Sequence, residues 1–318
     1  MHADGNVTDQ AFEDLLCQLS DRPRRVVSLR EQPPGPQGAS GAAIRYYDVT
    51  STDASGALYH DVLVTKDANL FERRVLHLLV EQTCAVPPVV LSDITTDERL
   101  PIYMPYLEAR PPLDLGHPTS PLTCSVAAGL AGIHAANRGQ PQPWLPAVAD
   151  DPRGRLWLYA WRERWEQNLA DPVFAAEFGA YTQRLDAAMA GFLKTLDALY
   201  AEGTSLTLLN VDLIPDHIRL WRNQACFIDW QQAAYGPLYL DLPNHFLVET
   251  ALVYRDALAD AGHTIPVTEF MERYHEVGRY MGLRYLGYAL WVWAQGGTQR
   301  EQGRWFLYYT FKLALHGR

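Results

Sequence analysis

The chain has 318 residues, of which 48% are hydrophobic and 20% charged, as in ordinary globular proteins with a sizeable core. Its net charge of −10 argues against a general nucleic-acid binder, because phosphate backbones select basic surfaces. Four scattered cysteines without a CxxC pair argue against a disulfide framework or a zinc site. No apolar run reaches the about 20 residues that span a bilayer, and no signal peptide is visible. We therefore expect a cytoplasmic protein without a membrane partner.

The first third of the chain predicts a small, largely antiparallel sheet with one inserted helix. An amphipathic helix is expected first, over residues 9–20. Strand patterns then occupy residues 25–29, 43–49, 58–65, 89–91 and 102–106. The inserted helix is expected over residues 69–82, and a loop rich in glycine and proline covers residues 33–41.

After Tyr106 the pattern changes, and a segment rich in proline and polar residues (108–121) predicts a hinge. Helices are then expected over residues 122–137, 155–169, 173–202, 240–261, 266–295 and 299–315. Residues 206–233 interrupt them with short strand-like runs and polar turns. The order predicts an α+β, two-lobed fold, with a β-rich lobe over 1–106 and a helical lobe over 107–318. A cleft between two such lobes is a favoured ligand site.

Two aspartates carry the most informative chemistry. Asp212 and Asp229 each follow an apolar strand-like run, and a hairpin-like connection would bring both to one end of a small sheet. One carboxylate can accept a hydroxyl proton while the other holds a divalent cation, which is the division of labour that phosphoryl transfer needs. Taken alone, Asp212 also fits a turn or helix-capping role.

The motifs around these aspartates resemble a known family. Residues 210–217 read Asn-Val-Asp-Leu-Ile-Pro-Asp-His, and residues 228–230 read Ile-Asp-Trp. They resemble the catalytic region of the aminoglycoside phosphotransferase and choline kinase family, where His-Gly-Asp-(three or four residues)-Asn precedes Ile-Asp-Trp or Ile-Asp-Phe. The later Gly-Pro-Leu-Tyr-Leu-Asp241-Leu resembles that family's Gly-Asp-Pro…Asp-Leu-Ala element. The resemblance implies a protein-kinase-like fold, with Asp212 catalytic, Asp229 binding a metal and Asp241 supporting.

The same resemblance implies roles for residues of the first lobe. Lys66, at the end of a predicted strand, would hold the α- and β-phosphates and pair with Glu72 on the next helix. Four further residues would contact the nucleotide: Gly38 and Ser40 in the covering loop, and Met104 and Tyr106 at the hinge.

The sequence departs from the family pattern at three positions. Asn210 and Val211 replace its histidine and glycine, and His217 stands where an asparagine helps to hold the metal. Magnesium prefers oxygen ligands, so the metal site would be completed either by His217 or by the adjacent Asp216.

These observations leave two hypotheses, and a third, transfer of a nucleotidyl group, has no positive sign in the sequence. In the first, the chain uses Mg²⁺ with ATP or GTP to phosphorylate a hydroxyl of a small acceptor, aminoglycoside- or amino-alcohol-like. The acidic charge slightly favours a cationic acceptor. In the second, the departures mark a pseudokinase, which binds nucleotide or acts as a scaffold without turnover.

Overall fold

The computed structural model of the chain describes residues 5–20, 22–33, 42–107, 117–158, 160–242 and 246–317. The chain divides into two compact units. Unit 1 comprises Met1–Pro112 and Asp216–Gln231, and unit 2 comprises Leu113–Pro215 and Gln232–Arg318. Unit 1 therefore takes in a short segment from the middle of the sequence, whereas the sequence-based division has one boundary, after residue 106.

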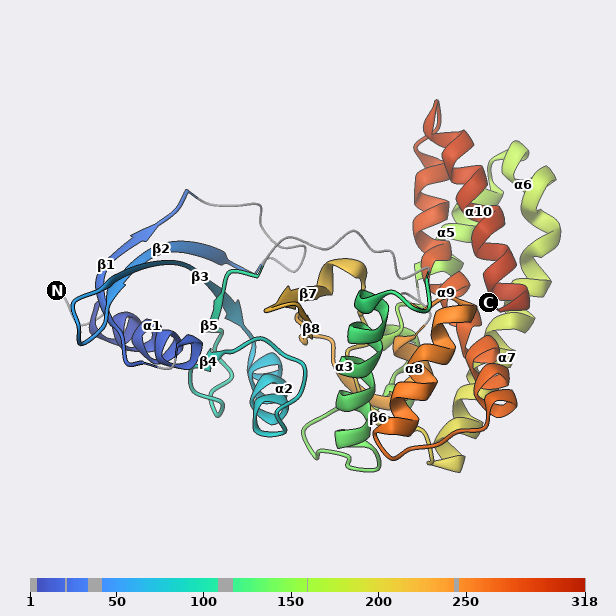
Figure 1. Ribbon diagram of the computed structural model, residues 1–318. Helices are drawn as coiled ribbons and strands as arrows, with labels where there is room; N and C mark the ends of the chain where they lie inside the picture. Colours follow the sequence, from blue (N-terminus) through green and yellow to red (C-terminus); the bar gives the residue numbers. More distant parts are fainter. Residues whose placement is uncertain are drawn as a thin grey trace. The chain divides into compact units, whose positions relative to one another are not determined.

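Unit 1 is built on a five-stranded antiparallel sheet in the order β1-β2-β3-β5-β4 (Figure 1). Its elements are α1 (Gly5–Leu19), β1 (Arg25–Glu31), β2 (Ile44–Thr52), β3 (Leu58–Ala68), α2 (Leu70–Glu81), β4 (Val90–Leu91), β5 (Leu100–Pro105), β7 (Ile218–Trp221) and β8 (Gln224–Phe227). The last two strands form a separate hairpin. The predicted small antiparallel sheet with one inserted helix is confirmed.

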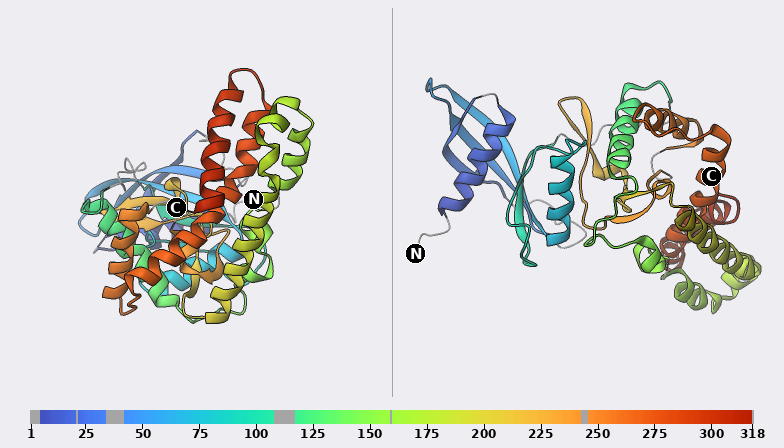
Figure 2. Two further views of the ribbon diagram at one scale, coloured as in Figure 1. Left: turned by 90° about the vertical axis from the view of Figure 1, so that its right-hand side faces the viewer. Right: turned by 90° about the horizontal axis from the view of Figure 1, so that it is seen from below.

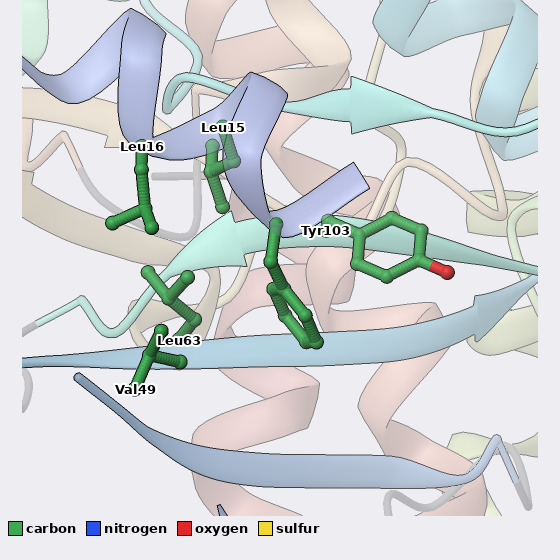
Figure 3. Close-up of a cluster of buried hydrophobic side chains, with 6 residues drawn as sticks. Leu15, Leu16, Val49, Leu63 and Tyr103 are labelled. Atoms are coloured by element: carbon green, nitrogen blue, oxygen red, sulfur yellow. The ribbon is translucent and has the colours of Figure 1, made fainter. Parts of the chain in front are cut away.

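The apolar face of α1 packs on this sheet (Figure 3). Phe12, Leu15 and Leu16 recur at helical spacing and are completely buried. Figure 3 shows Leu15 and Leu16 above the sheet, close to Val49 of β2 and Leu63 of β3. Burying each such side chain contributes about 1.5–3 kcal/mol, so α1 is an integral layer of unit 1.

A buried arginine fastens α2 to the sheet. The guanidinium of Arg73 is fully buried and donates four hydrogen bonds to main-chain carbonyl oxygens. Its acceptors are the carbonyl oxygens of Ala68, Asp93, Thr96 and Glu98, at 2.6–2.8 Å. Because Arg73 follows Glu72 directly, these bonds hold the first turn of α2, which also carries Glu72.

Unit 2 is mainly helical. Its elements are α3 (Pro121–Asn137), α4 (Pro152–Arg155), α5 (Ala160–Leu169), α6 (Pro172–Phe178), α7 (Thr182–Glu202), β6 (Leu206–Leu209), β9 (Ala234–Pro237), α8 (Val248–Asp260), α9 (Val267–Ala294) and α10 (Gln299–His316). The helix predicted over 155–169 begins only at Ala160, because Trp157 takes a left-handed φ of 54° that ends helical geometry. The helix predicted over 240–261 begins at Val248, after a 3₁₀ turn at Leu238–Asp241.

The two C-terminal helices form a tight antiparallel hairpin, seen in Figure 2 as the adjacent α9 and α10. A Cβ on Gly282 would lie 2.2 Å from the backbone nitrogen of Ala314, and one on Gly303 would lie 2.6 Å from the Cα of Trp293. Glycine at both crossing points lets the backbones approach closely. This packing holds α9, which carries a residue of the candidate active site, in a fixed register.

Candidate active site

Lys66 and Glu72 meet although only a few residues separate them. β3 ends at Ala68 and α2 begins at Leu70, so Asn69 alone joins them. The side chain of Asn69 caps α2 by accepting a hydrogen bond from the Glu72 N–H at 2.8 Å. Nζ of Lys66 donates to Oε1 of Glu72 at 2.7 Å, and both side chains are largely buried.

The same ammonium group reaches Asp229. Lys66 Nζ donates to Oδ1 of Asp229 at 2.7 Å, and Nε2 of His217 lies 3.2 Å from the other carboxylate oxygen. Asp229 has a left-handed φ of 61°, a conformation that aspartate tolerates better than most residues. All these residues belong to unit 1, so four of the predicted site residues converge within one compact body.

Hydrogen bonds to main-chain groups hold the segment that carries Asp229 in place beside Glu72. The Ile228 N–H donates to the carbonyl oxygen of His217 at 2.9 Å, which ties Asp229 to the neighbouring turn. Trp230 is completely buried, and its Nε1 donates to the carbonyl oxygen of Phe227 at 3.1 Å. Its backbone N–H also opposes the rise that burial causes in the pKa of the Glu72 carboxylate. The Ile-Asp-Trp motif is therefore anchored on both sides of its aspartate.

The charges of this cluster are set by burial and pairing. Burial alone would raise the pKa of Asp229, but the His217 hydrogen bond and the Lys66 ammonium outweigh it and hold that pKa at about 2. Burial alone would lower the pKa of Lys66, but Glu72 and Asp229 outweigh it and raise that pKa. Burial raises the pKa of Glu72, and the ammonium opposes part of this rise. At neutral pH, Lys66 is therefore cationic and Asp229 anionic.

Only part of a magnesium site can be recognised among the side chains near Asp229. Among the described residues, no group of three or more His, Cys, Asp or Glu side chains is arranged to hold a metal ion. Magnesium is usually held by one or two carboxylates, with water and substrate phosphates filling the remaining positions. The anionic Asp229 fits this requirement. His217 contacts Asp229 directly, whereas Asp216 lies exposed on the turn Pro215–His217.

Asp212 belongs to unit 2 and has different neighbours. The strand that precedes Asp212, β6, pairs with β9. The strand that precedes Asp229, β8, pairs with β7. The expectation that a hairpin-like connection brings both aspartates to one small sheet is therefore wrong. The two strand-like runs belong to separate two-stranded sheets, because β9 takes the place beside β6.

The carboxylate of Asp212 is paired with an arginine from α9. Nη2 of Arg284 forms an ion pair with Oδ1 of Asp212, and Nη1 donates to the carbonyl oxygen of Val211 at 2.9 Å. Arg284 is only 7% exposed, and the ring centroid of Trp157 lies 4.3 Å from its guanidinium carbon. The two carboxylates expected to carry the chemistry are thus both paired with cationic or imidazole side chains.

A second aspartate supports the backbone before Asp212. The buried Asp241 accepts the N–H of Asn210 at 2.8 Å and the N–H of Val211 at 2.9 Å. Its Oδ2 also lies 3.4 Å from Nε2 of His134. The other ring nitrogen of His134 lies 2.6 Å from the hydroxyl of Tyr254. Asp241 therefore joins the loop of Asp212 to α3 and α8, and His134 is part of that buried connection.

Val211 occupies a backbone position that suits glycine. Its φ is 66°, which is costly for a β-branched residue, and its side chain is 2% exposed. The family pattern that the sequence resembles has glycine here, whereas this chain places a packed apolar side chain on the turn. The bonds from Asp241 and Arg284 hold this unfavourable conformation from two sides.

This strain predicts an inverted order of stability between two substitutions. We expect Val211→Gly to be more stable than Val211→Ala by about 1 kcal/mol, because only glycine adopts a left-handed φ without cost. Chemical denaturation of both variants measures the difference. At Val277, a buried position inside α9, we expect the opposite order by a similar amount. If the alanine variant is more stable than the glycine variant at both positions, the backbone at Val211 is not strained.

The remaining predicted residues are placed as follows. Met104 lies on β5 opposite Val64 of β3, and the Tyr106 N–H donates to the carbonyl oxygen of Val62 at 2.9 Å. Tyr106 is 46% exposed at the end of the sheet. Gly38 and Ser40, with the loop around them, lie outside the described residues.

Arg284 and Trp157 were not predicted as site residues. Neither belongs to a motif, and Arg284 follows Asp212 by 72 residues. One signal was present in the sequence, since Gly-Leu-Arg284-Tyr-Leu places a charge within an otherwise apolar and aromatic helix. Such a charge is seldom buried without a partner.

Comparisons with known proteins identify the family and the fold of the chain. Residues 38–280 match the model of the phosphotransferase enzyme family. A choline kinase from Cryptosporidium parvum Iowa II is similar in structure, with a TM-score of 0.56, 12% identity and coverage of 90% of this chain and 88% of that chain. An aminoglycoside phosphotransferase from Alicyclobacillus acidocaldarius gives a TM-score of 0.54, 14% identity and coverage of 89% and 92%. A choline/ethanolamine kinase family protein from Mesorhizobium loti gives a TM-score of 0.51 and 14% identity, with coverage of 89% of this chain and 88% of that chain.

No curated protein sequence matches the chain. The family model, however, covers more than half of it, so the chain belongs to the phosphotransferase enzyme family. Its fold is the kinase-like α+β fold of the structures above, as the sequence predicted. Within the described part of the chain, no helix has the length and apolar character needed to cross a membrane.

Proposed function

We propose that the chain is a small-molecule kinase, which transfers the terminal phosphate of ATP or GTP to a hydroxyl group of a small acceptor. The observation that carries this proposal is the convergence of Lys66, Glu72 and Asp229, with both carboxylates 2.7 Å from the same ammonium group. A buried lysine fixed by a helix glutamate is the arrangement that positions nucleotide phosphates in kinase-like proteins.

Each residue has a distinct part in this proposal. Lys66 binds the α- and β-phosphates, and Glu72 orients its ammonium. Asp229 would hold Mg²⁺, with His217 or Asp216 completing the site, and the ion, when bound, neutralises charge on the phosphates. Asp212 orients the acceptor hydroxyl and accepts its proton. The chain contributes mainly positioning and charge neutralisation.

The acceptor follows less directly from the residues. Arg284 balances the charge of Asp212, so this carboxylate gives no special preference for a cationic molecule. We therefore propose a hydroxyl acceptor of either neutral or positive charge. We expect selectivity between the two to depend on residues farther from Asp212.

The direct test is phosphate transfer by the purified protein. We expect Mg²⁺-dependent transfer from ATP or GTP to at least one member of a panel of aminoglycosides, amino alcohols and sugars. Nucleotide with Mg²⁺ should also raise the melting temperature, since a ligand at 100 times its Kd stabilises by about 2.7 kcal/mol. The absence of both transfer and stabilisation would refute the proposal. Stabilisation without transfer would indicate a nucleotide-binding pseudokinase.

A substitution at Asp229 tests the proposed metal site. We expect Asp229→Ala to abolish the part of the thermal stabilisation that depends on Mg²⁺, because the variant loses the anionic oxygen ligand. Titration of nucleotide with and without Mg²⁺ measures this difference. Asp48→Ala is the matched control, since Asp48 is a carboxylate of unit 1 that pairs with Arg30 at the surface. Equal Mg²⁺ dependence in both variants would exclude Asp229 as a ligand.

A further inference from the structure

We propose that Arg284 is a positioning residue for phosphoryl transfer, which fixes the carboxylate of Asp212 and the turn that carries it. The inference rests on the proposed function, because it assumes that Asp212 meets the acceptor hydroxyl. It concerns a residue that lies on α9, far from the motifs in the sequence.

The contacts of Arg284 join two adjacent residues of one turn. Its Nη1 holds the carbonyl oxygen of Val211, and its Nη2 holds Oδ1 of Asp212. A guanidinium is planar and presents its donors in a fixed fork, so two bonds to neighbouring groups define the orientation of both. The carboxylate of Asp212 is therefore oriented relative to its own backbone.

The surroundings of Arg284 make this orientation stiff. The side chain is 3% exposed, and the Trp157 ring covers the guanidinium on one face at 4.3 Å. Arg164 of α5 donates to the carbonyl oxygen of Gly287 at 2.7 Å, which fixes α9 within one turn of Arg284. The guanidinium thus has a rigid base on α9 and little room to turn.

One carboxylate, that of Asp241, and one guanidinium, that of Arg284, hold the loop before Asp212. Asp241 binds the N–H groups of Asn210 and Val211, and Arg284 binds the carbonyl oxygen of Val211. The peptide groups on both sides of the left-handed Val211 are therefore held by side chains of opposite charge. Since the left-handed φ of Val211 is costly for valine, these side-chain bonds hold a conformation that the backbone does not prefer by itself.

The role of Arg284 predicts a selective effect on turnover. We expect Arg284→Lys to lower kcat about 100-fold, because an ammonium group cannot orient both groups and small misplacements of reacting groups cost about this much. KM for the nucleotide and its thermal stabilisation should stay within about twofold, since Lys66 and Asp229 belong to unit 1. Trp157→Leu, on a half-exposed loop, should lower kcat about three- to tenfold.

A double substitution separates positioning from a purely structural role. If Arg284 acts through Asp212, Arg284→Lys should cause less than a threefold further loss of kcat in an Asp212→Asn background. A structural role would give the same proportional loss in both backgrounds. Arg273→Lys is the matched control: it changes another arginine of α9, which pairs with Glu202 and Glu276 and not with Asp212, and its kcat should stay within about twofold.

The outcomes are distinct. If the wild type turns over and both Arg284→Lys and Trp157→Leu have the wild-type kcat, the inference is overturned and the proposed function stands. Should Arg284→Lys fail to fold, Trp157→Leu with and without Asp212→Asn provides the same comparison. Absence of turnover in the wild type would overturn the proposed function and this inference together.

Discussion

Replacing Asp212 by asparagine is expected to lower phosphate transfer by about 10²–10⁴-fold while leaving nucleotide binding nearly unchanged. Asparagine keeps the size of the side chain but removes the anionic oxygen that accepts the hydroxyl proton. It also removes the ion pair with Arg284, so the orientation of the side chain is weakened as well. Nucleotide binding depends in our proposal on Lys66 and Asp229, which lie in unit 1.

Initial rates with saturating nucleotide and acceptor measure the loss, and thermal stabilisation by nucleotide with Mg²⁺ measures binding. Asp197→Asn is the matched control, because Asp197 is an exposed aspartate on α7 of the same unit. Its transfer rate should equal that of the wild type. An Asp212→Asn variant with more than about a tenth of the wild-type rate would remove Asp212 from the mechanism.

The second large effect concerns stability. We expect Asp241→Ala to lower the free energy of unfolding by about 3–5 kcal/mol, because it leaves the buried N–H groups of Asn210 and Val211 without their acceptor. Each such group costs about 1–3 kcal/mol, and the left-handed turn at Val211 loses one of its two supports.

Chemical denaturation of Asp241→Ala, Asp241→Asn and the control Asp197→Ala measures this effect. The amide of the asparagine retains one acceptor oxygen, so we expect about half of the loss seen with alanine. The exposed Asp197 should change the free energy of unfolding by no more than about 0.5 kcal/mol. A loss within about 1 kcal/mol for Asp241→Ala would show that the loop is held by other contacts.

The parts of the fold that the sequence predicted well are those governed by local patterns. Alternating apolar residues define the strands of unit 1, and helical spacing defines α1, with Phe12, Leu15 and Leu16 facing the sheet. The contact between Lys66 and Glu72 was also accessible, because strand and helix are joined by Asn69 alone. The geometry of this contact agrees with the prediction, while its role in binding phosphate stays a proposal.

The parts that were missed depend on contacts between distant segments. The β9 strand reads Ala-Tyr-Gly-Pro, and its glycine and proline are typical of a turn, yet it pairs with β6. The partner of Asp212 could not be found from spacing, because Arg284 reaches it from a helix near the end of the chain. The late start of α5 follows from the left-handed Trp157, whose ring covers that same guanidinium.

The discontinuous sequence of unit 1 has a consequence for synthesis on the ribosome. The central sheet is complete at the end of β5, but β7 and β8 follow only about 110 residues later. At about 5–20 residues per second, roughly 6–20 s separate these events. During that interval the nascent chain has Glu72 but not Asp229 as a partner for Lys66. Lys66 therefore acquires its full surroundings only after the part of unit 2 over Leu113–Pro215 has been synthesised.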